Sequence, residues 1–237
     1  MALPAQPAPV RRPVRTIALV GIDGSGKTTQ AHRLAADMAA AGLPACYRRN
    51  AGGRRWFGRL AGLFGRRDAE DLLGRRAMLV IESVLRWLAI LRTLVRRALL
   101  REIAVMDRYA VCQYASLRAH GGRPAAERRA RLVYRVFPRP DVTFLLVVDP
   151  AVAYERIERR GYDHESMTYL TDAAAAYRAL PEYPEFVVVD ANGTPDEVAA
   201  AIRAELARRP MLPGPRRAVP SGPAPDRPVP DRPASTV

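Results

Sequence analysis

The residues best suited to chemistry lie together in segment 21–28, which reads GIDGSGKT. This sequence fits the pattern G-x-x-x-x-G-K-[ST], whose glycines let the backbone aim several N–H groups at one phosphate. Lys27 places a compact positive charge on the β- and γ-phosphates, and the hydroxyl of Thr28 is a ligand for Mg²⁺. The segment therefore predicts a binding site for ATP and Mg²⁺. The competing interpretation is a glycine turn that binds nothing.

The chain contains 38 lysine and arginine residues, of which Lys27 is the only lysine and 37 are arginine. A GC-rich genome would account for the excess of arginine, but not for this exception. A lysine that persists against such a bias indicates a position where a compact ammonium group is needed. With a single lysine, the chain also lacks the N-K-x-D motif by which GTPases read guanine. Within the loop we expect nucleotide contacts from Gly21, Asp23, Gly24, Ser25, Gly26, Lys27, Thr28 and Thr29.

The composition separates a central domain from two terminal segments. Residues 1–14 and 209–237 are rich in proline and arginine without apolar periodicity, which predicts disorder. The remaining residues, 15–208, suit one domain. The formal net charge of +14 suits an anionic partner such as a nucleotide, a nucleic acid or an acidic membrane face. In a chain this rich in arginine, the basic segment 48–67 is expected to be a solvated surface, so we expect no nucleic-acid partner.

Cysteine content and apolar patterning indicate where the protein works. Cys46 and Cys112 form no CxxC pair and have no histidine cluster nearby, which predicts neither a disulfide nor a zinc site and favours a reducing cytoplasm. The longest apolar stretch, 77–100, contains Glu82 and four arginines, so we expect no membrane span. Its apolar residues recur with helical spacing. This pattern predicts a buried or dimer-forming helix over 75–100.

Strand-like and helix-like segments alternate from one end of the central domain to the other. The expected strands are 16–21, 44–49, 102–106, 141–148 and 186–189. The expected helices are 27–41, 75–100, 109–120, 124–136, 150–160, 166–179 and 195–208. Segment 50–76 is expected to be mostly loop. The alternation predicts an α/β protein, a three-layer α/β/α P-loop NTPase fold with a mainly parallel, doubly wound sheet.

From about Thr16 to Arg208, the chain resembles the thymidylate kinase family. The resemblance rests on five motifs: GIDGSGKTTQ (21–30), LRW (85–87), MDRYA (106–110), PDVTFLLVVDPAVAYERIERRG (140–161) and VVVDANGTPDEV (187–198). It implies a kinase of nucleotide biosynthesis that uses ATP and Mg²⁺. The implied reaction is phosphoryl transfer to a nucleoside monophosphate, most directly dTMP to dTDP.

The resemblance also implies roles for individual residues. Asp23 would lie near the sugar hydroxyl of the acceptor, Arg108 would bridge the donor and acceptor phosphates, and Asp107 would lie near the metal or the acceptor. Arg86 would reach the acceptor base. Glu82 and Tyr109 are also expected to contact the substrate. From the arginine-rich segment 48–67 itself, we expect one or two arginines, Arg49 among them, to hold the acceptor phosphate. A mobile lid over 156–168 would supply three cations: Arg156, Arg159 and Arg160.

Several of these roles have a structural alternative. Glu82 and Arg86 are four residues apart and would also pair on the surface of a helix. Arg159 and Arg160 also fit a solvated helix end. Asp107 and Arg108 also fit a structural ion pair at a strand terminus. The residue types and spacing leave these alternatives open.

The departures from the family pattern fall on the acceptor side. Glu82 stands where the family usually has an aromatic residue that stacks on thymine, and Cys112 and Gln113 replace small or hydroxyl residues. Segment 48–56 lacks the usual acidic or proline-containing phosphate loop. Three functions stay open: a nucleoside monophosphate kinase acting on dTMP, a P-loop kinase of another small acceptor in specialised metabolism, and a non-catalytic nucleotide-binding regulatory or nucleic-acid-associated protein. A hydroxyl acceptor would need a base, for which Asp23, Glu82 or Asp107 is available.

Overall fold

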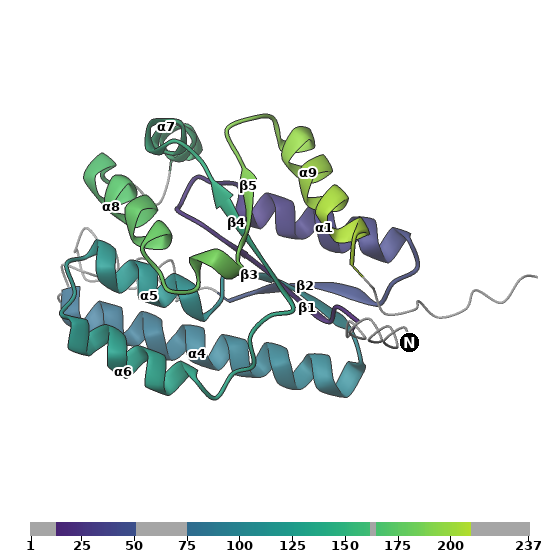
Figure 1. Cartoon of the computed structure of the whole chain (residues 1–237), viewed down its shortest axis with the longest axis horizontal. Helices are drawn as coiled ribbons and strands as arrows, with labels where there is room; N and C mark the ends of the chain where they lie inside the picture. Colours follow the sequence, from purple (N-terminus) through teal and green to yellow (C-terminus); the bar gives the residue numbers. More distant parts are fainter. Residues whose placement is uncertain (1–12, 51–74, 162–164, 210–237) are drawn as a thin grey trace, which may run out of the picture.

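Five parallel strands form one sheet in the computed structural model, which describes residues 13–50, 75–161 and 165–209 (Figure 1). Their order across the sheet is β2–β3–β1–β4–β5, and every neighbouring pair is parallel. The strands are β1 (Thr16–Val20), β2 (Ala45–Arg49), β3 (Ile103–Asp107), β4 (Val142–Val147) and β5 (Val187–Asp190). Such a sheet brings the carboxyl ends of all five strands to one edge, where α/β proteins of this kind bind their ligands.

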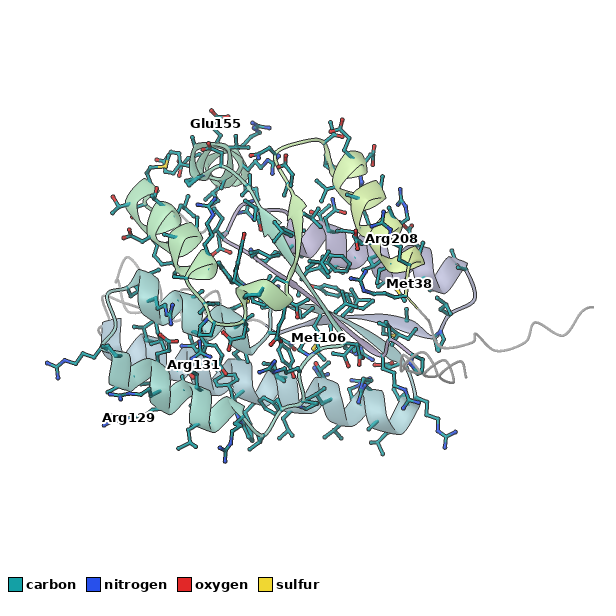
Figure 2. The ribbon with its side chains drawn as sticks, viewed as in Figure 1. Met38, Met106, Arg129, Arg131, Glu155 and Arg208 are labelled. Carbon is teal, nitrogen blue, oxygen red and sulfur yellow. The ribbon has the colours of Figure 1, made fainter. Side chains whose placement is uncertain are left out.

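The central strands read as continuous apolar runs because helices cover both faces of the sheet. Every residue of β1 and β3 is buried. Met106, in the middle layer of the molecule, has no exposed surface (Figure 2). Strands of this kind predict a parallel sheet because neither face meets water.

The helices form two layers around the sheet. Figure 1 shows α1 and α9 on one side, and α4, α5 and α6 on the other. Helices α7 and α8 follow β4 in the chain, and α8 packs against α5. The helices are α1 (Lys27–Ala40), α4 (Arg75–Leu100), α5 (Ala110–Ala119), α6 (Pro124–Tyr134), α7 (Pro150–Arg160), α8 (Met167–Arg178) and α9 (Pro195–Ala207), and a 3₁₀ turn, η1, spans Tyr183–Glu185.

Side-chain caps fix where three helices begin. The Asp149 carboxylate accepts from the Ala151 N–H at the start of α7, and the Ser166 hydroxyl accepts from the Tyr169 N–H at the start of α8. At α9, Thr194 and Glu197 form a reciprocal capping box. Each cap satisfies backbone donors that have no partner inside the helix.

The structure confirms the predicted fold class and nearly all the predicted elements. The helices expected over 75–100 and 150–160 have those bounds, and the other elements differ by one or two residues at an end. The turn η1 was not predicted. Val14 is buried in the core, so the folded part begins before the predicted limit of the N-terminal arm. Residues 1–12, the tail from residue 210, most of the loop 50–76 and residues 162–164 of the proposed lid lie outside the described residues.

Helix α4 buries one face and leaves an apolar stripe on the other. Its inward side chains include Glu82, Arg86, Ile90 and Thr93, all under 5% exposed. The outward stripe consists of Val80, Val84, Leu88, Leu91, Val95 and Leu99, which are 38–76% exposed. In the described parts of the chain, no helix combines the length and apolar character needed to cross a membrane.

An ion network joins α5, α6 and the segment after α8. Glu127 accepts from Arg118 (Nε to Oε2, 2.7 Å) and from Arg131 (Nε to Oε1, 2.8 Å). Arg131 also binds Glu182, and its guanidinium lies 4.4 Å above the ring of Tyr114. Although burial alone raises the pKa of Glu127, the two arginines outweigh it and hold this pKa below its ordinary value. Glu127 therefore stabilises the fold as a carboxylate.

We predict that Glu127→Gln lowers the free energy of unfolding by about 1–3 kcal/mol, because charged hydrogen bonds are lost while their arginines stay in place. The depressed pKa means that this stabilisation is complete above the ordinary carboxyl pKa and disappears as the pH falls through the folded-state value. Urea titrations at neutral and acidic pH measure both effects. Glu155→Gln, on the outer face of α7, is the control (Figure 2). An equal loss of stability at every pH would contradict the assignment.

Candidate active site

The loop between β1 and α1 has the backbone that a phosphate-binding loop requires. Gly21 has φ 142° and Gly24 has φ 81°, values that side chains other than glycine rarely tolerate. A Cβ on Gly21 would lie 2.5 Å from the carbonyl oxygen of Leu146, and one on Gly24 would overlap the backbone of Ala153. The glycines are therefore fixed by close packing against β4 and α7 as well as by the turn. Gly26, with φ 84°, caps the start of α1.

Lys27 lies buried inside this loop, with 5% of its surface exposed. Its Nζ donates to the carbonyl oxygen of Ile22 at 2.5 Å and to Ser25 Oγ at 3.4 Å, and lies 3.6 Å from Asp23 Oδ1. Burial, together with the charge of Arg108, lowers the pKa of Lys27, although Asp23 and Asp107 act in the opposite direction. A desolvated cation at the first turn of a helix is what a phosphate group needs.

The next residue connects the loop to the end of a different strand. Thr28 Oγ1 donates to Asp107 Oδ2 at 2.6 Å, joining the start of α1 to the end of β3. The hydroxyl of Tyr47, on β2, also reaches Asp107 Oδ2, at 3.3 Å. Burial and the nearby Asp107 raise the pKa of Tyr47 to about 12, so it stays a donor. Asp107 Oδ1 is buried and has no hydrogen-bond partner among the described residues.

Arg108 bonds across to the phosphate-binding loop. Its guanidinium pairs with Asp23 through Nη2 and Oδ1. Asp23 is the main reason that the pKa of Arg108 lies above its ordinary value. Asp107 receives hydrogen bonds from Thr28 and Tyr47, and the ion pair that the structure shows for Arg108 is with Asp23. One carboxylate, Asp23, lies beside both cations of the site.

The predicted acceptor residues of α4 face inward. Glu82 and Arg86 are 3% and 4% exposed, so the alternative that they pair on the surface of the helix is wrong. Arg86 Nη1 donates to Gln113 Oε1 of α5 at 2.6 Å, and Arg86 Nε is a buried donor with no partner in the described parts of the chain. Gln113 is 1% exposed. These groups form a buried polar cluster between α4 and α5.

The structure places four other predicted residues away from this cluster or gives them local partners. Arg156 donates to the carbonyl groups of residues 191–193 and so supports the loop after β5. The Tyr109 hydroxyl donates to the Pro138 carbonyl oxygen at 2.5 Å, which directs it into the core. Arg159 and Arg160 are exposed in the last turn of α7, which ends just before residues 162–164 of the predicted lid. Their lid role stays a prediction.

Two further predicted residues lie at the rim of the site. Arg49 is exposed at the end of β2, opposite Asp107 in the strand register. Thr29 is exposed in the first turn of α1. Both positions are open to a ligand at the carboxyl edge of the sheet, and their predicted contacts stay predictions.

Sequence reasoning missed three residues that contact the predicted ones: Tyr47, Asn50 and Gln113. Asn50 follows β2 directly, and its side-chain amide donates to the carbonyl oxygen of Arg108 at 2.9 Å. The rule that parallel strands end at the same edge was the available signal for Asn50. Gln113 lies in the first turn of α5, directly after the DRY residues 107–109, but its pairing with Arg86 depends on how α4 and α5 pack. No sequence signal pointed to Tyr47.

The oxygen groups around Asp107 suit a hard divalent cation. In the described ranges, no three or more His, Cys, Asp or Glu side chains cluster in a way that could hold a metal ion by themselves. Mg²⁺ does not need such a cage, because it binds through one or two protein oxygens and completes its shell with phosphates and water. Thr28 Oγ1 and the unpaired Asp107 Oδ1 are oxygens of this kind.

Comparison with known proteins gives one consistent result. A family model described as thymidylate kinase matches residues 19–202. A thymidylate kinase of Xanthomonas euvesicatoria is 34% identical over 204 residues, covering 81% of this chain and 85% of that protein. One of Solidesulfovibrio magneticus is 30% identical over 208 residues, covering 77% and 93%. A probable thymidylate kinase of Pyrobaculum aerophilum is 31% identical over 109 residues. In this match the chain spans about half (55%) of the length of that protein.

We predict that Lys27→Ala lowers phosphoryl-transfer turnover at least about 100-fold, because a desolvated cation aimed at the transferred group is lost. Steady-state ADP release with Mg-ATP measures the loss. Arg33→Ala is the matched control, since it removes an exposed cation of the same helix, one that pairs with exposed Asp196. A Lys27→Ala variant with the normal rate would exclude this loop from catalysis.

Proposed function

The chain belongs to the thymidylate kinase family, and on that premise we propose that it transfers the γ-phosphoryl group of ATP to dTMP, forming dTDP and ADP. The observation that carries this proposal is the meeting of the phosphate-binding loop with the end of β3. Thr28 bonds to Asp107, and Asp23 bonds to Arg108. Two segments about 80 residues apart in the sequence are thereby joined at one edge of the sheet.

The donor side of the proposed site consists of the loop and its lysine. Backbone N–H groups of residues 24–28 and the positive end of α1 would hold the β- and γ-phosphates of ATP, and Lys27 would neutralise them. Thr28 and Asp107 would hold Mg²⁺, which when bound neutralises charge on the phosphate oxygens. Asp23 lies beside both Lys27 and Arg108, so it orients the two cations before any phosphate is present.

Arg108 supports the transfer step itself. Its guanidinium presents several donors in a rigid plane, which suits two phosphate groups approaching each other. The dTMP phosphate is already an anion at neutral pH, so an oxygen of this phosphate attacks without a general base. The bond between the γ-phosphorus and the bridging oxygen of ATP breaks, and ADP leaves. Alignment and charge neutralisation are therefore the main contributions of the protein.

On the acceptor side, we propose that the Arg86–Gln113 pair reads the base. A guanidinium offers donors, and a carboxamide offers both a donor and an acceptor, a combination that matches the carbonyl and imide edge of thymine. Both side chains are buried, so a base that left them unpaired would bind poorly. Glu82 lies on the same inward face of α4, where the family usually has an aromatic ring. Turnover with a panel of different acceptors measures how this carboxylate affects the choice of acceptor.

We predict strong turnover with dTMP and none with thymidine in a panel of nucleoside monophosphates and nucleosides, measured by coupled ADP release. Arg86→Ala should raise the KM for dTMP at least about 10-fold and leave the KM for ATP unchanged, because it removes a charged contact to the acceptor alone. Turnover with a nucleoside would favour a hydroxyl acceptor. ATP binding without turnover of any nucleotide would favour a regulatory role.

We also propose that the outward stripe of α4 pairs with the same stripe of a second copy. Six exposed apolar side chains recur at helical spacing along one face, and an apolar patch of this kind marks an interaction surface. Exposed Leu132 and Val133 of α6, and Val136 in the turn after it, extend this stripe. Helix α6 lies alongside α4 and is joined to it by the hydrogen bond from Trp87 Nε1 to the Val133 carbonyl oxygen (Figure 1). A self-complementary helical face of this kind suits a two-fold homodimer.

We predict a dimer at micromolar concentration that Leu88→Glu converts to a monomer, because the mutation places a charge in the centre of the apolar stripe. Light scattering coupled to size exclusion gives the mass of each species. Met167→Glu, which charges an exposed position at the start of α8, is the control and should stay dimeric. A monomeric wild-type protein would remove the proposal without affecting the proposed reaction.

A further inference from the structure

Asn50 is a buried residue that donates hydrogen bonds to two consecutive backbone carbonyl groups. It has no exposed surface and lies directly after β2, at the carboxyl edge of the sheet. Its backbone N–H donates to the carbonyl oxygen of Asp107 at 3.0 Å, and its side-chain Nδ2 donates to that of Arg108 at 2.9 Å. Because a carbonyl oxygen only accepts, the amino group of this side chain must face Arg108. Oδ1 therefore points to a different partner.

Arg108 needs support because its backbone conformation is unfavourable. Its φ of 76° lies in the left-handed region, which residues other than glycine, asparagine and aspartate seldom adopt. Its N–H donates to the carbonyl oxygen of Leu19 at 3.1 Å. The residue is thus held by β1 through its amide hydrogen and by Asn50 through its carbonyl. In this conformation its side chain reaches Asp23.

The remaining partner of Asn50 lies on the acceptor helix. Thr93 Oγ1 donates to Asn50 Oδ1 at 3.1 Å, and Thr93 is 4% exposed on the inward face of α4. Arg86 lies two turns earlier on the same face. A continuous chain of hydrogen bonds therefore runs from α4 through the Asn50 amide to the backbone of Arg108.

We propose that Asn50 is a positioning residue for phosphoryl transfer, which holds Arg108 in its left-handed conformation and connects it through Thr93 to the helix that carries Arg86. This inference rests on the proposed function, in which Arg108 lies between the two phosphates. Transfer depends on alignment, and a displacement of about 1 Å in such a site costs about 100-fold in rate. Asn50 acts through Arg108 and touches no nucleotide itself.

The central test compares variants of Asn50 that keep its volume or remove its side chain. Asn50→Asp is isosteric but turns an acceptor toward the Arg108 carbonyl, and Asn50→Ala removes both side-chain bonds. We expect each to lower kcat for dTMP by about 10–100-fold. The Kd for Mg-ATP should change less than twofold, because Lys27 and Thr28 are intact. Unchanged kcat in both variants would overturn the proposal.

The link to α4 is tested separately at Thr93. Thr93→Val keeps the shape of the side chain and removes the hydroxyl, so kcat should fall by about 3–10-fold, and Thr93→Ser should restore it. Glu127→Gln controls for destabilisation, since it weakens the fold at a distance from the site and should keep the wild-type kcat. A fall in kcat in Glu127→Gln equal to that in the Asn50 variants would reduce Asn50 to a purely structural role.

A readout without turnover separates this inference from the proposed reaction. Hydrogen–deuterium exchange of the segment 107–112 should be at least about tenfold faster in Asn50→Ala than in the wild type, and unchanged in Glu127→Gln. If wild type phosphorylates no nucleotide, the proposed reaction fails, while the exchange result still decides whether Asn50 holds Arg108. Unchanged exchange in Asn50→Ala would overturn the inference even in an active kinase.

Discussion

The parallel pairing of β1 with β3 is the constraint on which the site depends. In this register Leu19 lies opposite Asp107, so the phosphate-binding loop begins where the Asp107–Arg108 segment begins. Both strands are buried on both faces, and a slip by one residue would move every side chain of β3 to the other face. Asp107 would then point away from Thr28. Burial of apolar residues in the sheet thus fixes the distance between two polar groups at its edge.

The charges of the site are arranged so that little reorganisation is needed on binding. Lys27 and Arg108 approach the same carboxylate, Asp23, and each cation keeps a defined direction. In water, two cations this close would repel each other and be free to turn. Here the buried lysine, the strained backbone of Arg108 and its hydrogen-bonded neighbours hold them. Because the two cations are oriented when the protein folds, they need not be reoriented during the reaction. Preorganisation of this kind lowers the activation barrier.

Sequence reasoning predicted the fold and the donor side well because both depend on local patterns. The apolar runs of β1, β3 and β4 define a parallel sheet, and segment 21–28 specifies its turn residue by residue. The acceptor side was harder. Arg86 was identified by the resemblance, but its partner Gln113 is set by the packing of α5 on α4, 27 positions apart in the sequence. Asn50 and Tyr47 act through β2, whose place at the sheet edge next to β3 no local pattern reveals.

The burial of Lys27 has a consequence for chemical labelling. Because Lys27 is the only lysine, the sole ε-amino group of this protein lies against the Ile22 carbonyl with 5% of its surface exposed. Its lowered pKa gives it a larger neutral, nucleophilic fraction than a surface lysine would have. Amine-directed reagents small enough to enter the loop therefore find a single lysine as their target. Amine chemistry, usually scattered over a surface, has on this chain one lysine site, in its phosphate-binding loop, besides the α-amino terminus.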